Sequence, residues 1–230
     1  MRPLAVALAA RTDMYDASDL SERIRRMEPV PAFQFHFGLV TLLVNAVDDD
    51  QKAIDRIIRH LLVFGGDINQ LSRLQWDHQF GSVLHWAAAS EGKELVVDLL
   101  CRHVTGINLN RVNAQGYTPL HLAVLNSRAE VVNQLVATSG INVNARDAYG
   151  HTPLSLAATR GGMPGAYDVI VSLTQDLRVD IVAEDVYGNT AWDLAQRSGS
   201  FDVMYALNNA LVIRQNAVGE RVIVIDDDDE

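Results

Sequence analysis

The sequence is poor in the features that support disulfide, membrane or nucleic-acid chemistry. It has one cysteine, Cys101, so no intramolecular disulfide can form, which suits a reducing compartment. No apolar run approaches the ~18 residues that a membrane-spanning helix needs. Basic residues number 19 against 29 acidic ones. This acidic balance argues against direct binding of nucleic acid, because phosphate recognition needs a basic stripe.

Lysine is also scarce, since Lys52 and Lys93 are the only two and the other basic residues are arginines. We interpret this either as the mark of an arginine-favouring genome or as selection against ubiquitin acceptor sites. The remaining composition is ordinary for a globular protein of one large or two small domains, with 48% hydrophobic and 21% charged residues in a length of 230. The formal net charge of −10 is uneven, because the segment Asp226–Glu230 is entirely acidic.

A segment of the form Gly-x-Thr-Pro-Leu-x-Leu-Ala recurs along the chain. Its clearest copies begin at Gly116 and Gly150, and related copies begin at Gly188 and Gly81. A degenerate fifth copy begins at Thr41. Successive Thr or Ser anchors lie 34 to 41 residues apart. A period in this range is the signature of stacked structural repeats.

Thr-Pro-Leu-His-x-Ala at this spacing resembles the ankyrin repeat, whose period is about 33 residues. The resemblance covers roughly residues 38–212 and is strongest for the units that begin near Asn113 and Asp147. Leu95–Leu100 and Val131–Val136 fit the second helix of the unit. The resemblance implies an all-α solenoid of about five helix-turn-helix units, connected by turns or short hairpins.

The residues of one unit explain why it would fold this way. Thr118 offers an oxygen that can cap the first free N–H groups of a helix, and Pro119 fits the first helical turn, where no N–H is required. Leu120 and the small Ala123 fall on one apolar face at helical spacing. Gly116 can take the positive φ of a turn. One unit alone leaves its apolar face open, so neighbouring units must stack to build a core.

This organisation divides the chain into three parts. We predict an N-terminal capping segment over 1–37, an ankyrin-repeat domain over 38–213 and a flexible acidic tail over 214–230. The last helix is expected to span Phe201–Ile213, because hydrophobic periodicity fades beyond it.

The N-terminal segment has its own signals. Asp19-Leu-Ser-Glu22 reads as a capping box that starts a short capping helix. The alternating phenylalanines from Phe33 to Phe37 are interpreted either as packing against the weak first repeat or as a partner-binding strand. The apolar stretch Leu4–Ala10 is at the short limit for a signal peptide, and secretion by that route is not expected.

Catalytic and metal-binding patterns are not found. His85 and His121 occupy the histidine of the repeated motif, which in the ankyrin family is structural and ties adjacent turns. Cys101 follows two leucines in an apolar helix, as an inert thiol would. Gly161–Gly165 is glycine-rich but lacks the Gly-Lys-Ser/Thr of a phosphate loop, and is expected to be a mobile loop between helices. We therefore expect no enzyme, no cofactor and no metal; an enzyme site near this loop is a rival hypothesis.

The resemblance implies protein binding through the turn tips and the concave face of the first helices. The positions that correspond to these exposed surfaces are Trp76, His78, Phe80, Gln115, Tyr117, Leu125, Asn126, Arg146, Tyr149, His151, Thr159, Arg160, Glu184, Tyr187, Asn189 and Arg197. Tyrosine, tryptophan and arginine are the residues that most often dominate interface energy. The alternative is that Tyr149 and Tyr187 only pack across neighbouring turns.

The end of the chain has the form of a short linear ligand. Val222, Ile223, Val224 and Ile225 favour an extended strand, and Asp226 and Asp227 begin the acidic run. Such a strand can add to the open edge of another sheet, where the acids steer it to basic residues. The segment resembles the motif that binds the small ubiquitin-like modifier SUMO. The alternative is a strand that docks on its own last repeat, with the acids guarding against aggregation.

The sequence thus predicts a monomeric, non-enzymatic adaptor or inhibitor in the nucleus or cytoplasm, with a protein partner and no membrane or nucleic-acid contact. The tail would bind SUMO as a second site. Three alternatives remain open: a regulatory subunit that masks a transcription factor or an enzyme, a pathogen effector inside a host cell, and a purely structural spacer.

Overall fold

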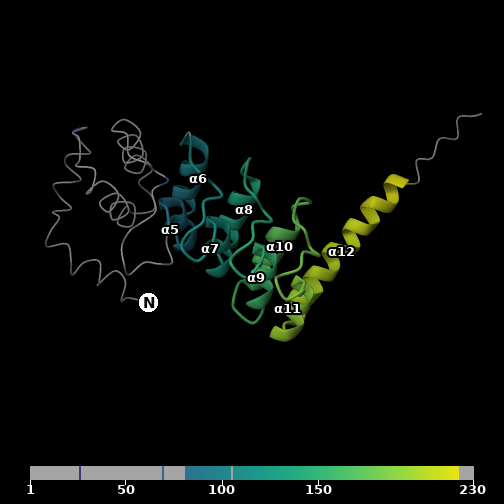
Figure 1. Cartoon of the computed structure of the whole chain (residues 1–230). Helices are drawn as coiled ribbons and strands as arrows, with labels where there is room; N and C mark the ends of the chain where they lie inside the picture. Colours follow the sequence, from purple (N-terminus) through teal and green to yellow (C-terminus); the bar gives the residue numbers. More distant parts are fainter. Residues whose placement is uncertain (1–25, 27–68, 70–80, 105, 223–230) are drawn as a thin grey trace, which may run out of the picture.

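The computed structural model describes residues 26, 69, 81–104 and 106–222 (Figure 1). Over these residues the chain is all-helical, with eight helices that alternate between two rows. The helices are α5 (Val83–Ala89), α6 (Glu94–His103), α7 (Pro119–Leu125), α8 (Ala129–Ala137), α9 (Pro153–Thr159), α10 (Ala166–Thr174), α11 (Ala191–Ser198) and α12 (Phe201–Val222).

Each unit is one helix pair, and the pairs stack in a single row (Figure 1). The first helices pack α5 on α7, α7 on α9 and α9 on α11, while the second helices pack α6 on α8, α8 on α10 and α10 on α12. This arrangement confirms the predicted all-α solenoid. The expected capping helix, the degenerate first unit and the phenylalanines near Phe35 lie outside the described residues.

The first helices begin where the sequence predicts, because a hydroxyl precedes each of them. Thr118 Oγ1 accepts a hydrogen bond from the backbone N–H of His121, and Thr152 Oγ1 accepts one from Ser155. Thr190 does the same for the N–H of Asp193. A cap of this kind stabilises a helix by about 1 kcal/mol, which matters for helices of only seven or eight residues.

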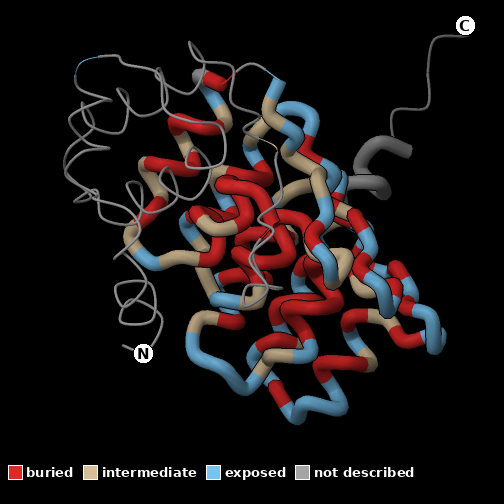
Figure 2. Tube along the Cα trace, turned by 60° about the vertical axis from the view of Figure 1, so that its left-hand side comes forward, coloured by how far each residue is buried: buried red, intermediate tan, exposed pale blue. Residues whose placement is uncertain are grey.

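The buried residues form a continuous core that runs through the stacked helix pairs, as in an elongated repeat protein (Figure 2). Leu84, Leu120 and Leu154 hold the same position in three successive first helices and are at most 1% exposed. Burial of each such leucine contributes about 1.5–3 kcal/mol. Ala123 and Ala157 are equally buried, and their small side chains allow neighbouring first helices to approach closely.

Asparagine side chains bridge the connections that lead from one unit to the next. Asn110 donates from Nδ2 to the carbonyl of Gly140 (2.8 Å) and accepts at Oδ1 from the N–H of Asn142 (2.7 Å). Asn144, one unit later, makes the same two bonds to Arg178 and Asp180. These bonds satisfy backbone groups that would otherwise lack partners in an irregular segment.

Two arginines from later in the chain bind backbone carbonyls at or just after the ends of the second helices. Arg178 Nη2 donates to the carbonyl of Val136 near the end of α8. Arg214 reaches back from α12 to the carbonyls of Thr174, Asp176 and Val179. A cation at a helix C-terminus is favourable because the free carbonyls there carry partial negative charge.

The expected end of the last helix is wrong. α12 continues past Ile213 to Val222, so Arg214 belongs to the repeat body and not to a tail. The sequence between these positions is helix-compatible but weakly periodic, and periodicity reports packing on a core rather than helix formation itself. Val222 is therefore helical and not the first residue of a strand, while Ile223 and all residues after it lie outside the described residues.

Candidate protein-binding surface

The turns between units are built on a buried acid or amide. Asp147 Oδ1 accepts from the N–H groups of Tyr149 (2.8 Å) and His151 (2.9 Å). Asp185 holds the next turn in the same way through Tyr187 (2.8 Å) and Asn189 (2.9 Å). Each turn therefore has a fixed backbone, and its tip residue points away from a rigid base.

Two buried histidines connect consecutive turns, as the resemblance implied. His85 Nδ1 accepts from the backbone N–H of Ser82 (3.1 Å), so the proton is on Nε2, which donates to the carbonyl of Tyr117 (3.0 Å). His121 repeats this between Thr118 and the carbonyl of His151 (3.2 Å). Burial lowers the pKa of His85 to about 4 and also lowers the pKa of His121, so both rings are neutral at pH 7.

The tips of these turns expose large apolar side chains. Tyr149 is 56% exposed and Tyr187 is 74% exposed, and they occupy the same position in successive turns. Val186 beside Tyr187 is 63% exposed, and its N–H donates to the carbonyl of Tyr149 (3.2 Å). This bond joins the two tips, which form one continuous row. We call Tyr149, Val186 and Tyr187, together with the exposed Val112 and Val182 of the segments that lead into turns, the tip row.

Arg146 and His151 lie beneath the tip row and are held by other groups. Arg146 Nη1 donates to the carbonyls of Gly150 and Glu184, which fixes the guanidinium across two units. His151 lies between the buried carboxylates of Asp147 (Nδ1 to Oδ2, 3.2 Å) and Asp185 (Nε2 to Oδ2, 3.7 Å). Both side chains thus help to join neighbouring turns, a structural role that is separate from any contact with a partner.

The structure sorts the other predicted residues by exposure. Exposed residues are Asn126, Arg146, Tyr149, Thr159, Glu184, Tyr187 and Arg197. Half-buried residues are Gln115, Tyr117, Leu125, His151 and Arg160. Trp76, His78, Phe80, Ile223, Val224, Ile225, Asp226 and Asp227 lie outside the described residues.

The expected exposure of Asn189 is wrong. Its side chain is buried and donates from Nδ2 to both carboxylate oxygens of Asp185, at 3.1 and 3.0 Å. His151 occupies the same position one unit earlier, where it also contacts the acid of its own turn but is half-buried. The amide group of Asn189 is thus used within the turn, and its side chain is not available to a partner.

Sequence reasoning missed the valines of the tip row. Val182 is 63% exposed where the preceding units carry the bridging Asn110 and Asn144. Val186 takes the place of Ala148 in the previous turn. Aligning the units position by position would have found both, because a valine that replaces a bridging amide or a small residue at an exposed turn has no role in the core.

The glycine-rich loop that was the rival enzyme site is packed against the next unit. Ser200 Oγ donates to the carbonyl of Gly161 (2.8 Å), and Ser198 Oγ donates to that of Ala158 (3.3 Å). A Cβ placed on Gly161 would lie 2.5 Å from Ser200 Cβ. The glycine is thus required for close approach between units, which is a structural explanation of its presence.

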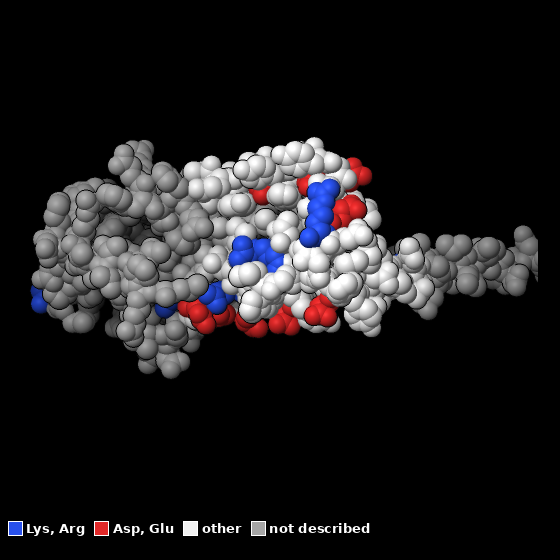
Figure 3. All heavy atoms as spheres, turned by 90° about the horizontal axis from the view of Figure 1, so that it is seen from below, with Lys and Arg blue, Asp and Glu red and all other residues white. Residues whose placement is uncertain are grey.

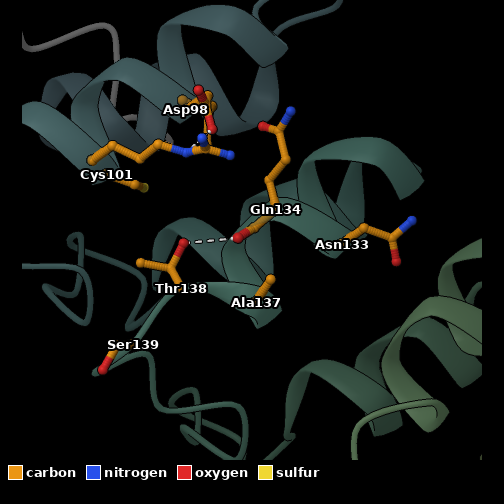
Figure 4. Close-up of a pocket in the computed structure, with 9 residues that line it drawn as sticks. Asp98, Cys101, Asn133, Gln134, Ala137, Thr138 and Ser139 are labelled. Atoms are coloured by element: carbon orange, nitrogen blue, oxygen red, sulfur yellow. Dashed lines mark hydrogen bonds and ion pairs between the residues drawn. The ribbon is translucent and has the colours of Figure 1, made fainter.

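An open groove of about 550 Å³ lies between α6 and α8 (Figure 4). Cys101 lines it, and burial raises the pKa of this thiol, which makes it a poor nucleophile at neutral pH. Asp98 pairs with Arg102 at 2.6 Å, and Thr138 donates to the carbonyl of Gln134. Asp98 and Thr138 thus have partners, whereas Gln134 Oε1 is buried without a hydrogen-bond partner. This arrangement does not resemble a nucleophile with an adjacent base.

Charge and metal-binding groups are sparse over the part of the chain that the structure describes. Seen from below, basic and acidic side chains form small separate groups on a largely uncharged face, without a continuous basic stripe (Figure 3). Among the described residues no three His, Cys, Asp or Glu side chains are placed to hold a metal ion. Within the same residues no helix is long and apolar enough to cross a membrane.

Comparison with known proteins finds a family match for part of the chain. Residues 43–147 match the family model of ankyrin repeats, in three copies. No curated protein matches the chain. The helix pairs α9–α10 and α11–α12 continue the same stacking beyond the matched residues. Ankyrin repeats are typically non-enzymatic modules that bind other proteins. The chain thus carries ankyrin repeats over residues 43–147, and its fold is that of an ankyrin-repeat solenoid.

Proposed function

We propose that the protein is a non-enzymatic adaptor or inhibitor that holds a protein partner on the tip row and the adjoining ends of the first helices. The observation that carries this proposal is the row of exposed tyrosines and valines on hydrogen-bonded turns, from Tyr149 to Tyr187. Such side chains add nothing to the core, and exposed apolar side chains gathered in one place mark interaction sites.

The construction of the turns favours tight binding. Tyrosine offers a large contact area and a polar tip with only two rotatable side-chain bonds. Because Asp147 and Asp185 already fix the backbone, little conformational entropy is lost when a partner binds. We expect truncation of Tyr149 or Tyr187 to reduce the binding free energy by about 2 kcal/mol.

Site-specific photo-crosslinking tests the proposal. A photoreactive phenylalanine analogue is placed at Tyr187, and in a matched variant at Leu177, which is also 74% exposed but lies in the connection after α10. A partner captured only at position 187 supports the proposal, provided that Tyr149→Ala/Tyr187→Ala weakens its affinity at least tenfold. Equal capture at both positions, or an affinity unchanged by the double substitution, would contradict it.

The same proposal includes a second site in the tail. Ile223, Val224 and Ile225 are followed by five acidic residues, and we propose that this segment binds SUMO as an added strand. Because α12 ends at Val222, we propose that the strand begins at Ile223 and not at Val222. A second weak site on the same chain would raise the affinity for a SUMO-modified partner through effective concentration.

Titration of fluorescently labelled SUMO tests the tail directly. We expect the full chain to bind and Ile223→Ala/Val224→Ala to lose at least tenfold in affinity. Asn216→Ala, an exposed substitution within α12, is the control and should leave binding unchanged. Binding that is equal for all three proteins would refute the assignment.

The partner decides between the narrower roles. An inhibitor that masks a transcription factor or an enzyme would lower the activity of the captured protein when added in equimolar amount. A pathogen effector would capture a protein of a host cell. We propose the nucleus or cytoplasm as the site of action; imaging of the tagged chain would refute this if it showed secretion.

A further inference from the structure

The second helices can be compared position by position because each carries an apolar pair followed by a buried leucine. The pair is buried in α6, α8 and α10, and in α12 its second member, Met204, is half-buried. In α8 this set is Val131, Val132 and Leu135, and in α12 it is Val203, Met204 and Leu207. Residues two places before the pair lie at the start of each helix, on the outer side. Along the solenoid these residues are Glu94, Ala129, Tyr167 and Phe201.

The position one turn later shows the same progression. It reads Asp98, Asn133, Val171 and Tyr205 from α6 to α12. In the first two helices these positions are polar or small: Asn133 is exposed, and Glu94, Asp98 and Ala129 are half-buried. In α10 and α12 three of the four residues are aromatic, although the fold tolerates polar residues there; the fourth, Val171, is half-buried against the core. Packing of the repeat therefore does not explain Phe201 and Tyr205.

These side chains are exposed and lie close together. Tyr167 is 45% exposed, Phe201 80% and Tyr205 63%, and α10 packs directly on α12. Val212, 44% exposed, extends the stripe along α12 at spacings of four and seven residues, opposite to the side that packs on the core. Met163 is 50% exposed in the loop before α10.

The inserted loop is held against the start of α12. The carbonyl of Gly161 accepts from Ser200 Oγ at 2.8 Å, and Phe201 is the next residue. Met163 therefore lies in a loop that is fixed beside the aromatic residues. We name Met163, Tyr167, Phe201, Tyr205 and Val212 the outer aromatic surface.

The charges around the outer aromatic surface are acidic on α10 and α12. Asp168 follows Tyr167 and Asp202 follows Phe201, and both are exposed. Arg214 on the same helix is directed into the body, where it binds carbonyls. The acidic run Asp226–Glu230 lies beyond the other end of α12 in the sequence. Arg197, the exposed cation at the end of α11, interacts with Asp193 on its own helix.

We propose that the outer aromatic surface binds an amphipathic helix with basic flanks, supplied by a protein other than the tip-row partner. A helix laid along α12 would place apolar side chains at i, i+4 and i+7 on the stripe from Phe201 to Val212. Its lysines or arginines would meet Asp168 and Asp202, and the net charge of −10 would speed the encounter.

Fluorescence anisotropy with a defined probe tests this on the full chain. The probe is a labelled 18-residue helical peptide of leucine and lysine, with leucine at i, i+3, i+4 and i+7. We expect it to bind at least tenfold more tightly than a scrambled peptide of equal charge. Phe201→Glu/Tyr205→Asp should abolish this difference. These are the residues that α6 carries at the same positions, so the fold accommodates them.

Three controls make the result decisive. Asn133→Asp, the corresponding change on α8, should leave the affinity unchanged, as should Tyr187→Ala in the tip row. Circular dichroism checks that each variant is folded. Equal binding of both peptides, or binding unaffected by the double substitution, overturns the proposal. If sedimentation velocity shows that the chain self-associates and the double variant does not, the surface joins copies of the chain and the proposal is also wrong.

Discussion

The two bridging histidines give the stability of the protein a definite dependence on pH. Each accepts a backbone N–H at Nδ1, so protonation of that nitrogen would break a bond at the base of a helix. Burial is the main cause that lowers both pKa values, for His85 from 6.5 to about 4. The unfolded chain therefore takes up protons before the folded chain does as the pH falls.

We predict that the free energy of unfolding falls by about 1 kcal/mol through His85 between pH 6.5 and 5.5, and that His121 lowers it further in the same direction. The contribution is complete above the unfolded pKa and is lost as the pH falls towards that of the folded state. Urea titrations at a series of pH values measure it. His85→Gln/His121→Gln should be less stable at pH 7, and its free energy of unfolding should change less with pH over this range. An equally small change with pH in the wild-type protein would contradict the prediction.

Residue chemistry within a motif was predictable from the sequence, but side-chain direction at the edge of the motif was not. Thr118 as a cap and His121 as a bridge follow from the chemistry of one unit and its resemblance to a known repeat. Asn189 precedes the motif and was expected to be exposed, but it folds back on Asp185. This bond depends on side-chain length and local geometry, which the alignment of positions does not report.

At the scale of elements, the junction between the loop after α9 and the loop after α11 depends on Gly161. We predict that Gly161→Ala destabilises the protein by about 1–3 kcal/mol, because the added Cβ would lie 2.5 Å from Ser200 Cβ. Gly162→Ala is the matched control, since no atom lies within 4 Å of its added Cβ. Thermal denaturation compares the two, and equal melting temperatures would show that the contact is unimportant.

Arg214 joins α12 to the connection after α10. We predict that Arg214→Ala lowers the free energy of unfolding by about 1–3 kcal/mol, because the carbonyls of Thr174, Asp176 and Val179 lose a charged donor. Hydrogen exchange should increase in residues 174–180 in particular. Gln215→Ala, at the exposed neighbouring position, serves as the control. If its exchange pattern matches that of Arg214→Ala, the bonds of Arg214 to the three carbonyls have no measurable role.

Helix starts were easier to predict than the end of the last helix. A start is marked by a capping hydroxyl such as Thr152, whereas α12 lacks a glycine or proline near Ile213 that would stop it. The fading of hydrophobic periodicity there reflects the end of packing on the core. The end of a helix is a separate physical event, so fading periodicity predicts it poorly.

At the scale of the whole molecule, stability depends on contacts between neighbouring units, so position along the row matters. Leu154 and Leu207 are both at most 1% exposed, in an internal and a terminal unit respectively. Truncating either to alanine removes a similar contact, at a cost of about 2–5 kcal/mol. We predict that Leu154→Ala lowers protection from hydrogen exchange in α7 to α12, whereas Leu207→Ala lowers it only in α11 and α12. An identical pattern for both variants would mean that the solenoid unfolds as one unit.

The bridging histidines also give the solenoid a direction. His121 depends on the carbonyl of His151 in the following unit, but this carbonyl also accepts from Asp147 within its own turn. Loss of the following unit would leave the buried Nε2–H of His121 without an acceptor. Loss of the preceding unit would leave the carbonyl of His151 still bonded to Asp147. Shortening the domain after α8 should therefore cost more than removing the same length from the other side. In the next unit Ser155 stands where the earlier units have the histidine. Its hydroxyl donates to the carbonyl of Thr152 in the same unit, so it needs no following unit. A domain shortened after α10 therefore keeps the hydrogen bonds of both histidines.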